Sequence, residues 1–163
     1  MPAEPLRMDL SKLAPDAYRH FLQLEGLIGG HVERKLLHLL KLRASQINGC
    51  AFCIAMHTDE ALRDGEPVER LTLLDAWEES SLFSEKERAA LAWIEEVTLI
   101  ADSGASKSAF EALKPHFSEA EIAWLTLAAV QINAWNRMAI SSRAQYDAKM
   151  FAHRAPEKAP EPA

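Results

Sequence analysis

Residues 41–57 read KLRASQINGCAFCIAMH, and this stretch indicates how the chain folds. Apolar residues recur at helical spacing from about Val32 to Ile47. Asn48-Gly49 then interrupts the pattern, and because Asn is a favoured helix N-cap, the next helix is expected to begin at Asn48 and end near Gly65. The stretch therefore predicts two consecutive helices joined by a tight turn.

Helical spacing continues along the whole chain, and no segment shows the convincing alternation of a β-strand. Pro67 suits the start of a helix, and Ser-x-x-Glu capping boxes begin at Ser84 and Ser118. The remaining helices are expected at about residues 16–27, 67–79, 85–101, 106–114 and 119–151. The predicted fold is thus all-α, a single-domain bundle of about six to seven helices.

Three parts of the chain are expected to differ in character. Residues 1–14 form an N-terminal extension, residues 15–151 the helical domain, and residues 152–163 a disordered tail rich in Pro, Ala and Glu. Within the domain, residues 122–135 are apolar nearly all round, which predicts a central helix or one at a subunit interface. Asn133, Asn136 and Arg137 are expected to bond within a subunit contact or beside the cysteine-bearing helix.

Composition narrows the class of protein. The chain has 163 residues, 48% of them hydrophobic, and a formal charge of −6, which argues against nucleic acid or an anionic membrane as partner. No run approaches the roughly 18 apolar residues of a membrane span, and no secretory signal is visible, so a cytoplasmic location is expected. In that reducing compartment, a pair of cysteines three residues apart is typically metal-binding or redox-active.

The only two cysteines, Cys50 and Cys53, precede His57 at helical spacing. Cys50 and Cys53 are an i, i+3 pair, and Cys53 and His57 an i, i+4 pair, so all three share one stripe of a helix. The helix N-terminus favours an anion and lowers the pKa of a nearby thiol. We therefore expect Cys53, next to His57, to be the activated thiolate that attacks an oxidant, and Cys50 to be the resolving thiol.

Two other interpretations of these residues remain open. They could be ordinary core residues, or they could bind zinc with His38 as the fourth ligand. Zinc sites usually combine a cysteine knuckle with ligands from a separate segment, whereas Cys53 and His57 share one helical turn. We therefore expect neither a metal nor another cofactor.

The run from Lys41 to His57 resembles the core motif of the alkylhydroperoxidase D-like branch of the carboxymuconolactone decarboxylase family. INAWNR at residues 132–137 resembles the second recurring block of that branch, and residues 73–93 are also similar to it. The similarity covers roughly residues 15–145. It implies an all-helical fold and a homo-oligomer, either a trimer or a hexamer.

By position, the resemblance implies that Cys53 is the peroxidatic cysteine, Cys50 its resolving partner and proton donor, and His57 the proton relay. The family's glutamate, twelve residues before the first cysteine, is His38 here. A histidine can shuttle protons but cannot supply a fixed negative charge. His38 is therefore a possible relay in place of that glutamate, or else a residue that merely packs on its helix.

These features together predict a thiol-dependent peroxidase that reduces hydrogen peroxide or organic hydroperoxides through a Cys50–Cys53 disulfide. A dithiol protein or a small thiol would regenerate it. A non-catalytic, redox-sensing or chaperone-like oligomer is the alternative from another class. Decarboxylation of a lactone carboxylate, which names the wider family, is a further alternative, although that chemistry has no evident need for a dithiol.

Overall fold

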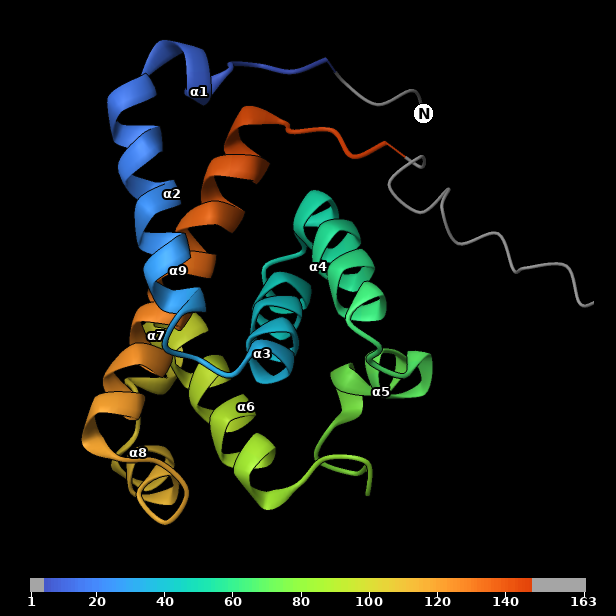
Figure 1. The fold of residues 1–163 in the computed structure, drawn as a ribbon, viewed down its shortest axis with the longest axis vertical. Coiled ribbons are helices and arrows are strands. Elements are labelled where there is room, and N and C mark those ends of the chain that lie inside the picture. The colour runs from blue at the N-terminus through green and yellow to red at the C-terminus, as the bar shows by residue number, and fades with distance from the viewer. Residues whose placement is uncertain (1–4, 148–163) are drawn as a thin grey trace, which may run out of the picture.

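The computed structural model describes residues 5–147, and within this range every regular element is a helix (Figure 1). The all-α prediction is therefore confirmed, while the tail predicted as disordered at residues 152–163 lies outside the described residues. The elements are α1 (Leu10–Leu13), α2 (Pro15–Gly29), α3 (Arg34–Ile47), α4 (Ala51–Arg63), α5 (Val68–Thr72), the 3-10 turn η1 (Leu74–Ala76), α6 (Glu85–Thr98), α7 (Ile100–Ser103), α8 (Lys107–Leu113) and α9 (Glu119–Ser142).

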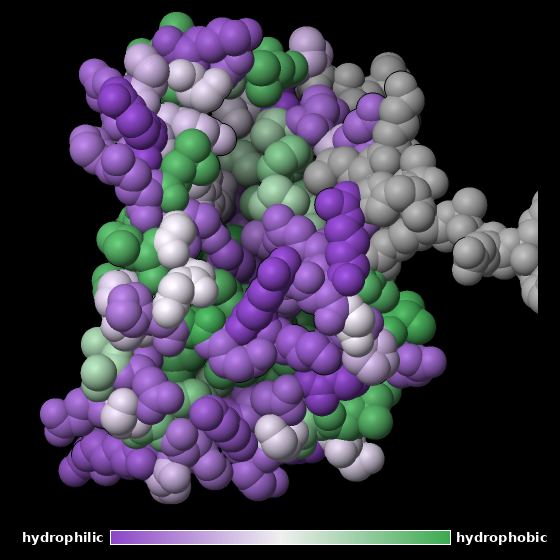
Figure 2. Space-filling model, in the orientation of Figure 1, coloured by the Kyte–Doolittle hydropathy of each residue, from purple (hydrophilic) through white to green (hydrophobic). Residues whose placement is uncertain are grey.

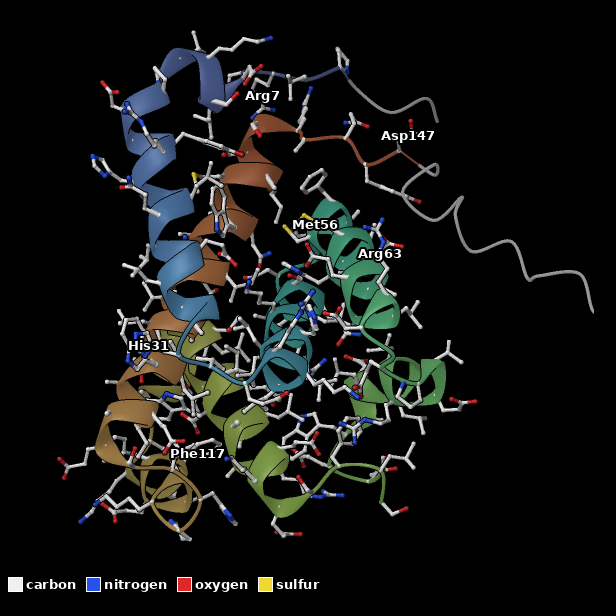
Figure 3. The ribbon with its side chains drawn as sticks, viewed as in Figure 1. Arg7, His31, Met56, Arg63, Phe117 and Asp147 are labelled. Atoms are coloured by element: carbon white, nitrogen blue, oxygen red, sulfur yellow. The ribbon has the colours of Figure 1, made fainter. Side chains whose placement is uncertain are left out.

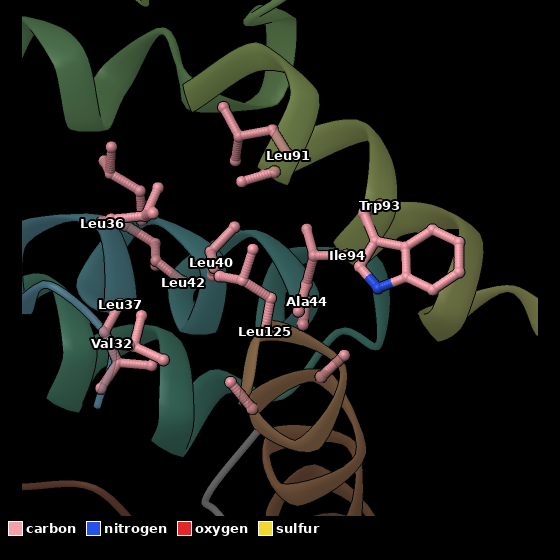
Figure 4. Close-up of a cluster of buried hydrophobic side chains, with 14 of the residues drawn as sticks. Val32, Leu36, Leu37, Leu40, Leu42, Ala44, Leu91, Trp93, Ile94 and Leu125 are labelled. Atoms are coloured by element: carbon pink, nitrogen blue, oxygen red, sulfur yellow. The ribbon is translucent and has the colours of Figure 1, made fainter. Parts of the chain in front are cut away.

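Helix α3 lies at the centre and packs against α4, α6 and α9, while α2 packs along α9 (Figure 1). Its leucines are buried on nearly every side, and Leu39, Leu40 and Leu42 are almost wholly inaccessible. Figure 4 shows this cluster meeting side chains of α6 and of α9, among them Leu91 and Leu125. Each buried leucine stabilises the fold by about 1.5–3 kcal/mol relative to an exposed one, so α3 is the scaffold on which α4 rests.

The turn between α3 and α4 differs from the prediction in a way that matters for the cysteines. Asn48 is the C-cap of α3 and not the N-cap of the next helix. Gly49 has a φ of 66°, the left-handed conformation that glycine adopts without a steric penalty. Cys50 is itself the N-cap of α4, so the cysteine pair straddles the very start of the helix.

Other boundaries follow the expected caps, with three corrections. Both predicted capping boxes are present, at Ser84 and Ser118. The helix expected over residues 67–79 ends at Thr72 and gives way to η1. From Leu71, in the last turn of α5, the buried residues recur every three positions, at Leu74 and Trp77, and this spacing suits a 3-10 turn. The helix expected over residues 85–101 ends at Thr98, before α7.

The last helix is shorter than the expected range of residues 119–151. It ends at Ser142, where Arg143 takes a left-handed φ of 57°, and residues 148–151 lie outside the described range. The N-terminal segment runs over this end of α9, since the backbone N–H of Arg7 donates to the Ser142 carbonyl at 2.8 Å. None of the helices described for this chain has the length and apolar character needed to cross a membrane.

Candidate active site

The two cysteines meet at the N-terminus of α4. Their sulfur atoms lie 2.7 Å apart, within hydrogen-bonding distance, and both are free thiols. The backbone N–H of Cys53 donates to the Cys50 sulfur at 3.4 Å, as expected for an N-cap side chain. The structure thus brings the two predicted redox residues together in the reduced state, only a small movement away from the roughly 2.05 Å of a disulfide bond.

The pair shares one proton unequally. The hydrogen bond between Cys50 and the Cys53 thiol lowers the pKa of Cys50. With the backbone N–H of Cys53 and the Asn136 amide, it outweighs the effect of burial and brings that pKa to about 7. That same hydrogen bond, together with burial and the charge on Cys50, raises the pKa of Cys53. The order of the pKa values is therefore the reverse of the order expected from the Cys53–His57 spacing, because the hydrogen bond between the two thiols, with help from the backbone N–H of Cys53 at the N-cap, favours the charge on Cys50.

His57 is buried on the same helix and points its ring nitrogen Nδ1 at Glu60, whose Oε2 accepts at 2.9 Å. Burial raises the pKa of Glu60, but the hydrogen bond from His57 and the nearby positive charges outweigh it, so the pKa is lowered overall. Sequence reasoning missed Glu60. The signal was present, since a carboxylate three residues after a histidine on a helix faces the same side.

His38 lies on α3 and bonds to the residue that caps the end of α4. Its Nε2 donates to Oδ2 of Asp64 at 2.5 Å, and Arg34 pairs with the same oxygen. His38 also lines a second cavity of about 550 Å³, whose wall includes Lys41 and Glu60. Over residues 5–147, no hydrogen bond joins His38 to His57, and the two histidines are linked only by the effect that each has on the pKa of Glu60.

The zinc arrangement considered from the sequence is not formed. Among the described residues, no three His, Cys, Asp or Glu side chains converge as a group that could hold a metal ion. His38, the proposed fourth ligand, is instead bound to Asp64.

A cavity of about 630 Å³ opens beside the cysteine pair. Of the two cysteines, only Cys53 lines it, together with His57 and Glu60. Figure 2 shows hydrophobic side chains at the floor of a recess near the top of the view, and Figure 3 shows Met56 on α4 beside this space. The apolar wall comes from the N-terminal segment, α2, α4 and α9, and includes Leu6, Met8, Tyr18, Leu22, Phe52, Met56, Trp135 and Met138.

The charges on the cavity wall are mostly negative. Lys41 lies there in an ion pair with Glu25, and the indole N–H of Trp135 donates to the other oxygen of Glu25 at 3.0 Å. Asp9 and Glu60 add two further carboxylates. The wall therefore offers an apolar surface with a polar end near His57, and its lysine is already neutralised by a carboxylate.

Comparison with known proteins agrees with this architecture. Residues 15–96 match the model of the carboxymuconolactone decarboxylase family. An uncharacterised protein of Bacillus subtilis, YdfG, is 35% identical over 136 residues, which cover 83% of this chain and 92% of that protein. A crystal structure of a protein of unknown function from Agrobacterium tumefaciens, a suggested antioxidant defence protein AhpD, is 42% identical, with a TM-score of 0.85 over 88% of this chain and 99% of the other.

A more distant likeness shows that the fold accommodates other chemistry. The crystal structure of the debrominase Bmp8 is 23% identical and superposes with a TM-score of 0.73, covering 86% of this chain and 76% of Bmp8. At that identity the likeness concerns the fold alone. The matched family model and the two nearer relatives together place this chain in the carboxymuconolactone decarboxylase family, in its alkylhydroperoxidase D-like branch.

Proposed function

We propose that the protein is a thiol-dependent peroxidase in which Cys53 attacks the peroxide and Cys50 resolves the product. The observation that carries this proposal is the 2.7 Å sulfur–sulfur contact at a helix N-terminus, with one of the two sulfurs facing an apolar cavity that also contains a histidine. A purely structural pair of thiols has no need of a cavity. A lone reactive thiol has no need of a partner.

The first step uses the shared proton. In the resting pair Cys50 carries the charge, but Cys53 is the sulfur that lines the cavity. When a hydroperoxide enters, Cys50 takes the proton of Cys53, and the Cys53 thiolate attacks the outer peroxide oxygen. The O–O bond breaks, the departing alkoxide takes a proton relayed by His57, and the products are an alcohol and a Cys53 sulfenic acid.

The second step closes the disulfide. The Cys50 sulfur loses its proton and attacks the sulfenic sulfur, which releases water and forms the Cys50–Cys53 bond. An external dithiol then reduces this disulfide by exchange and returns both thiols. Over the cycle one hydroperoxide and one dithiol become one alcohol, one water and one disulfide.

The cavity favours organic hydroperoxides over hydrogen peroxide. A space of about 630 Å³ with aromatic and methionine walls is far larger than hydrogen peroxide needs, and burial of an apolar substituent there contributes about 25 cal/mol per Å². The carboxylates on the wall disfavour substrates that are themselves anionic. The best substrate is therefore a bulky, uncharged hydroperoxide.

The proposal includes a homo-oligomer in the cytoplasm, where thiol reductants are available. Supporting the oligomer, α2 and α9 expose large apolar side chains, with Leu22, Leu27 and Val130 each more than half exposed. Light scattering coupled to gel filtration should give a mass of three or six chains. A monomer at micromolar concentration would contradict this part of the proposal.

The decisive experiment measures steady-state consumption of cumene hydroperoxide with dithiothreitol as reductant. Cys53→Ser should abolish turnover, because no thiol then lines the cavity. Cys50→Ser should still be oxidised once, giving a sulfenic acid that dimedone traps, but should not form the internal disulfide. Wild-type turnover in Cys53→Ser would refute the assignment.

The same assay separates a peroxidase from a redox sensor. A peroxidase converts many equivalents of hydroperoxide per chain while reductant lasts, whereas a sensor becomes oxidised once. The single-turnover rate of wild-type protein, followed by quenching and counting free thiols, gives the comparison. A slow, single oxidation with no catalytic cycling would favour the sensor.

A further inference from the structure

Asn136, on α9, is wholly buried and bonds to Asn48 and to Ser45, whose backbone carbonyl in turn accepts from the Cys50 N–H at 3.0 Å. A buried carboxamide has an oxygen that accepts and a nitrogen that donates two hydrogens, so its effect on a thiolate depends on which end faces the sulfur. The neighbours of Asn136 determine that orientation from both sides.

On one side stands Asn48, the C-cap of α3. Its Nδ2 lies 3.0 Å from the backbone carbonyl of Ala44, 3.0 Å from Oδ1 of Asn133 and 2.9 Å from Oδ1 of Asn136, so its two hydrogens face three acceptor oxygens. A carbonyl can only accept, which fixes the nitrogen of Asn48 on that side. The atom of Asn136 that faces Asn48 must then be its oxygen.

On the other side stands Ser45, also buried. Its hydroxyl hydrogen is committed to the backbone carbonyl of Lys41 at 2.7 Å, so its lone pairs remain to accept. Nδ2 of Asn136 lies 3.0 Å from this hydroxyl and donates one hydrogen to it. Both neighbours therefore demand the same orientation of the amide, and the second N–H of Asn136 is left for the sulfur atoms.

We infer that Asn136 is a fixed N–H donor to the Cys50–Cys53 pair and holds the reduced pair in its singly ionised form. The inference deepens the proposed function, because this pair is its reacting group. A donor hydrogen bond stabilises a thiolate more than a thiol, and it does so most effectively where water is excluded. Asn136 thus acts on the reacting sulfurs from a helix far along the chain.

The electrostatic surroundings agree with this role. The Asn136 amide lowers the pKa of both thiols. The charged or titratable groups that share the cavity wall with Cys53 are His57 and Glu60 of α4, Lys41 of α3, Tyr18 and Glu25 of α2, and Asp9, the N-cap of α1. Among these, Lys41 is paired with Glu25 and His57 with Glu60, so each positive group already has a carboxylate partner.

The test is a thiolate titration of the reduced protein without oxygen, followed by absorbance near 240 nm from pH 5 to 10. Asn136→Leu keeps about the same volume but has no donor, and Asn136→Asp keeps the oxygen that Asn48 requires. Gln131→Leu is the matched control: Gln131 is a buried carboxamide on the same helix that donates to the backbone of Phe21 at 2.8 Å. Circular dichroism melts establish that each variant is folded.

The wild-type protein should titrate with a midpoint near 7. The midpoint should rise by about one pH unit or more in Asn136→Leu and further in Asn136→Asp, toward or beyond the ordinary thiol value of about 8.5, and should not move in Gln131→Leu. A wild-type midpoint in both folded Asn136 variants, or an equal rise in the control, would overturn the inference. Because the titration needs no peroxide, its result is independent of whether the protein turns over hydroperoxides.

Discussion

The Nδ1–H of His57 donates to Oε2 of Glu60 at 2.9 Å, one turn along the same helix. With Nδ1 occupied by a carboxylate, the other ring nitrogen, Nε2, is the one available to exchange protons in the cavity that His57 shares with Cys53. Position 38, where the family resemblance implies a glutamate, is a histidine here, and Glu60 of α4 places a carboxylate beside His57 instead.

Replacement of this carboxylate should weaken proton transfer without dismantling the site. In Glu60→Gln the partner of His57 loses its charge, so kcat/KM for cumene hydroperoxide should fall about tenfold, less than the full contribution of a general acid–base group. Stopped-flow peroxide consumption across pH 5–9 measures the change. Asp59→Asn is the control, because Asp59 is a buried carboxylate on the same helix that forms an ion pair with Arg63. Equal losses in both variants would assign Glu60 to stability alone.

The rate should follow ionisation of the cysteine pair. The hydrogen bond between the two thiols lowers the pKa of Cys50 to about 7. The reactive, singly ionised pair is therefore present above pH 7, and it gains a proton below that pH. The rate of disulfide formation by peroxide should therefore fall about tenfold for each pH unit below 7 and level off above it. Rapid-quench thiol counting gives this profile. A midpoint near 8.5 would show that the pair behaves as ordinary thiols.

His38 should contribute more to stability than to turnover. Its Nε2 bonds to Asp64, which Arg34 also contacts, and this cluster joins α3 to the C-cap of α4. His38→Ala should lower the melting temperature by about 2–4 °C and leave kcat/KM within about twofold of the wild-type value. His38→Glu restores the residue that the family resemblance implies. It should be less stable still, because the new carboxylate would lie beside those of Asp64 and Glu60. A large loss of turnover at an unchanged melting temperature would instead make His38 a relay.

Filling the cavity should change which peroxide is used. Ala139, on α9, lines the cavity, and Ala139→Phe adds a ring to a space that a bulky substrate needs. kcat/KM should fall at least tenfold for cumene hydroperoxide but remain within about threefold for hydrogen peroxide. The measurement is the ratio of kcat/KM for cumene hydroperoxide to kcat/KM for hydrogen peroxide. Ala92→Phe would be an unsuitable control, because Ala92 packs on the core. Ala123→Phe, at an exposed position on α9, serves instead. Parallel losses for both peroxides would argue against selection by the cavity.

Much of the fold was predictable because its signals are local. The capping boxes at Ser84 and Ser118 mark their helices correctly, and apolar spacing locates the helix that becomes α3, although the sequence pointed to residues 122–135 as the candidate central helix. The end of α9 was not predictable. The helical pattern runs on past Ser142, and only the left-handed backbone of Arg143, set by the segment that packs there, stops it.

The residues that form the site were easier to predict than the charge that each of them carries. The spacing of Cys50 and Cys53 correctly indicated that their sulfurs meet. Which thiol carries the charge depends on whether Asn48 or Cys50 caps α4, a difference of two residues that helix propensity does not resolve. The position of Asn136 in the site depends on the packing of α9 against α3. Its partner Ser45 is 91 residues away in the sequence, so no local pattern predicts the contact.

The backbone hydrogen bond from Arg7 to Ser142 joins the N-terminal segment to the end of α9, and residues from both ends of the described chain line the cavity beside Cys53. A small molecule held there would rest on Leu6 and Met8 from the first segment and on Met138 from the last helix. Its binding would then stabilise the contact between the N-terminal segment and the end of α9. Occupancy should consequently slow proteolysis of the amino-terminal segment, a gain in protection that can be followed without any knowledge of the reaction.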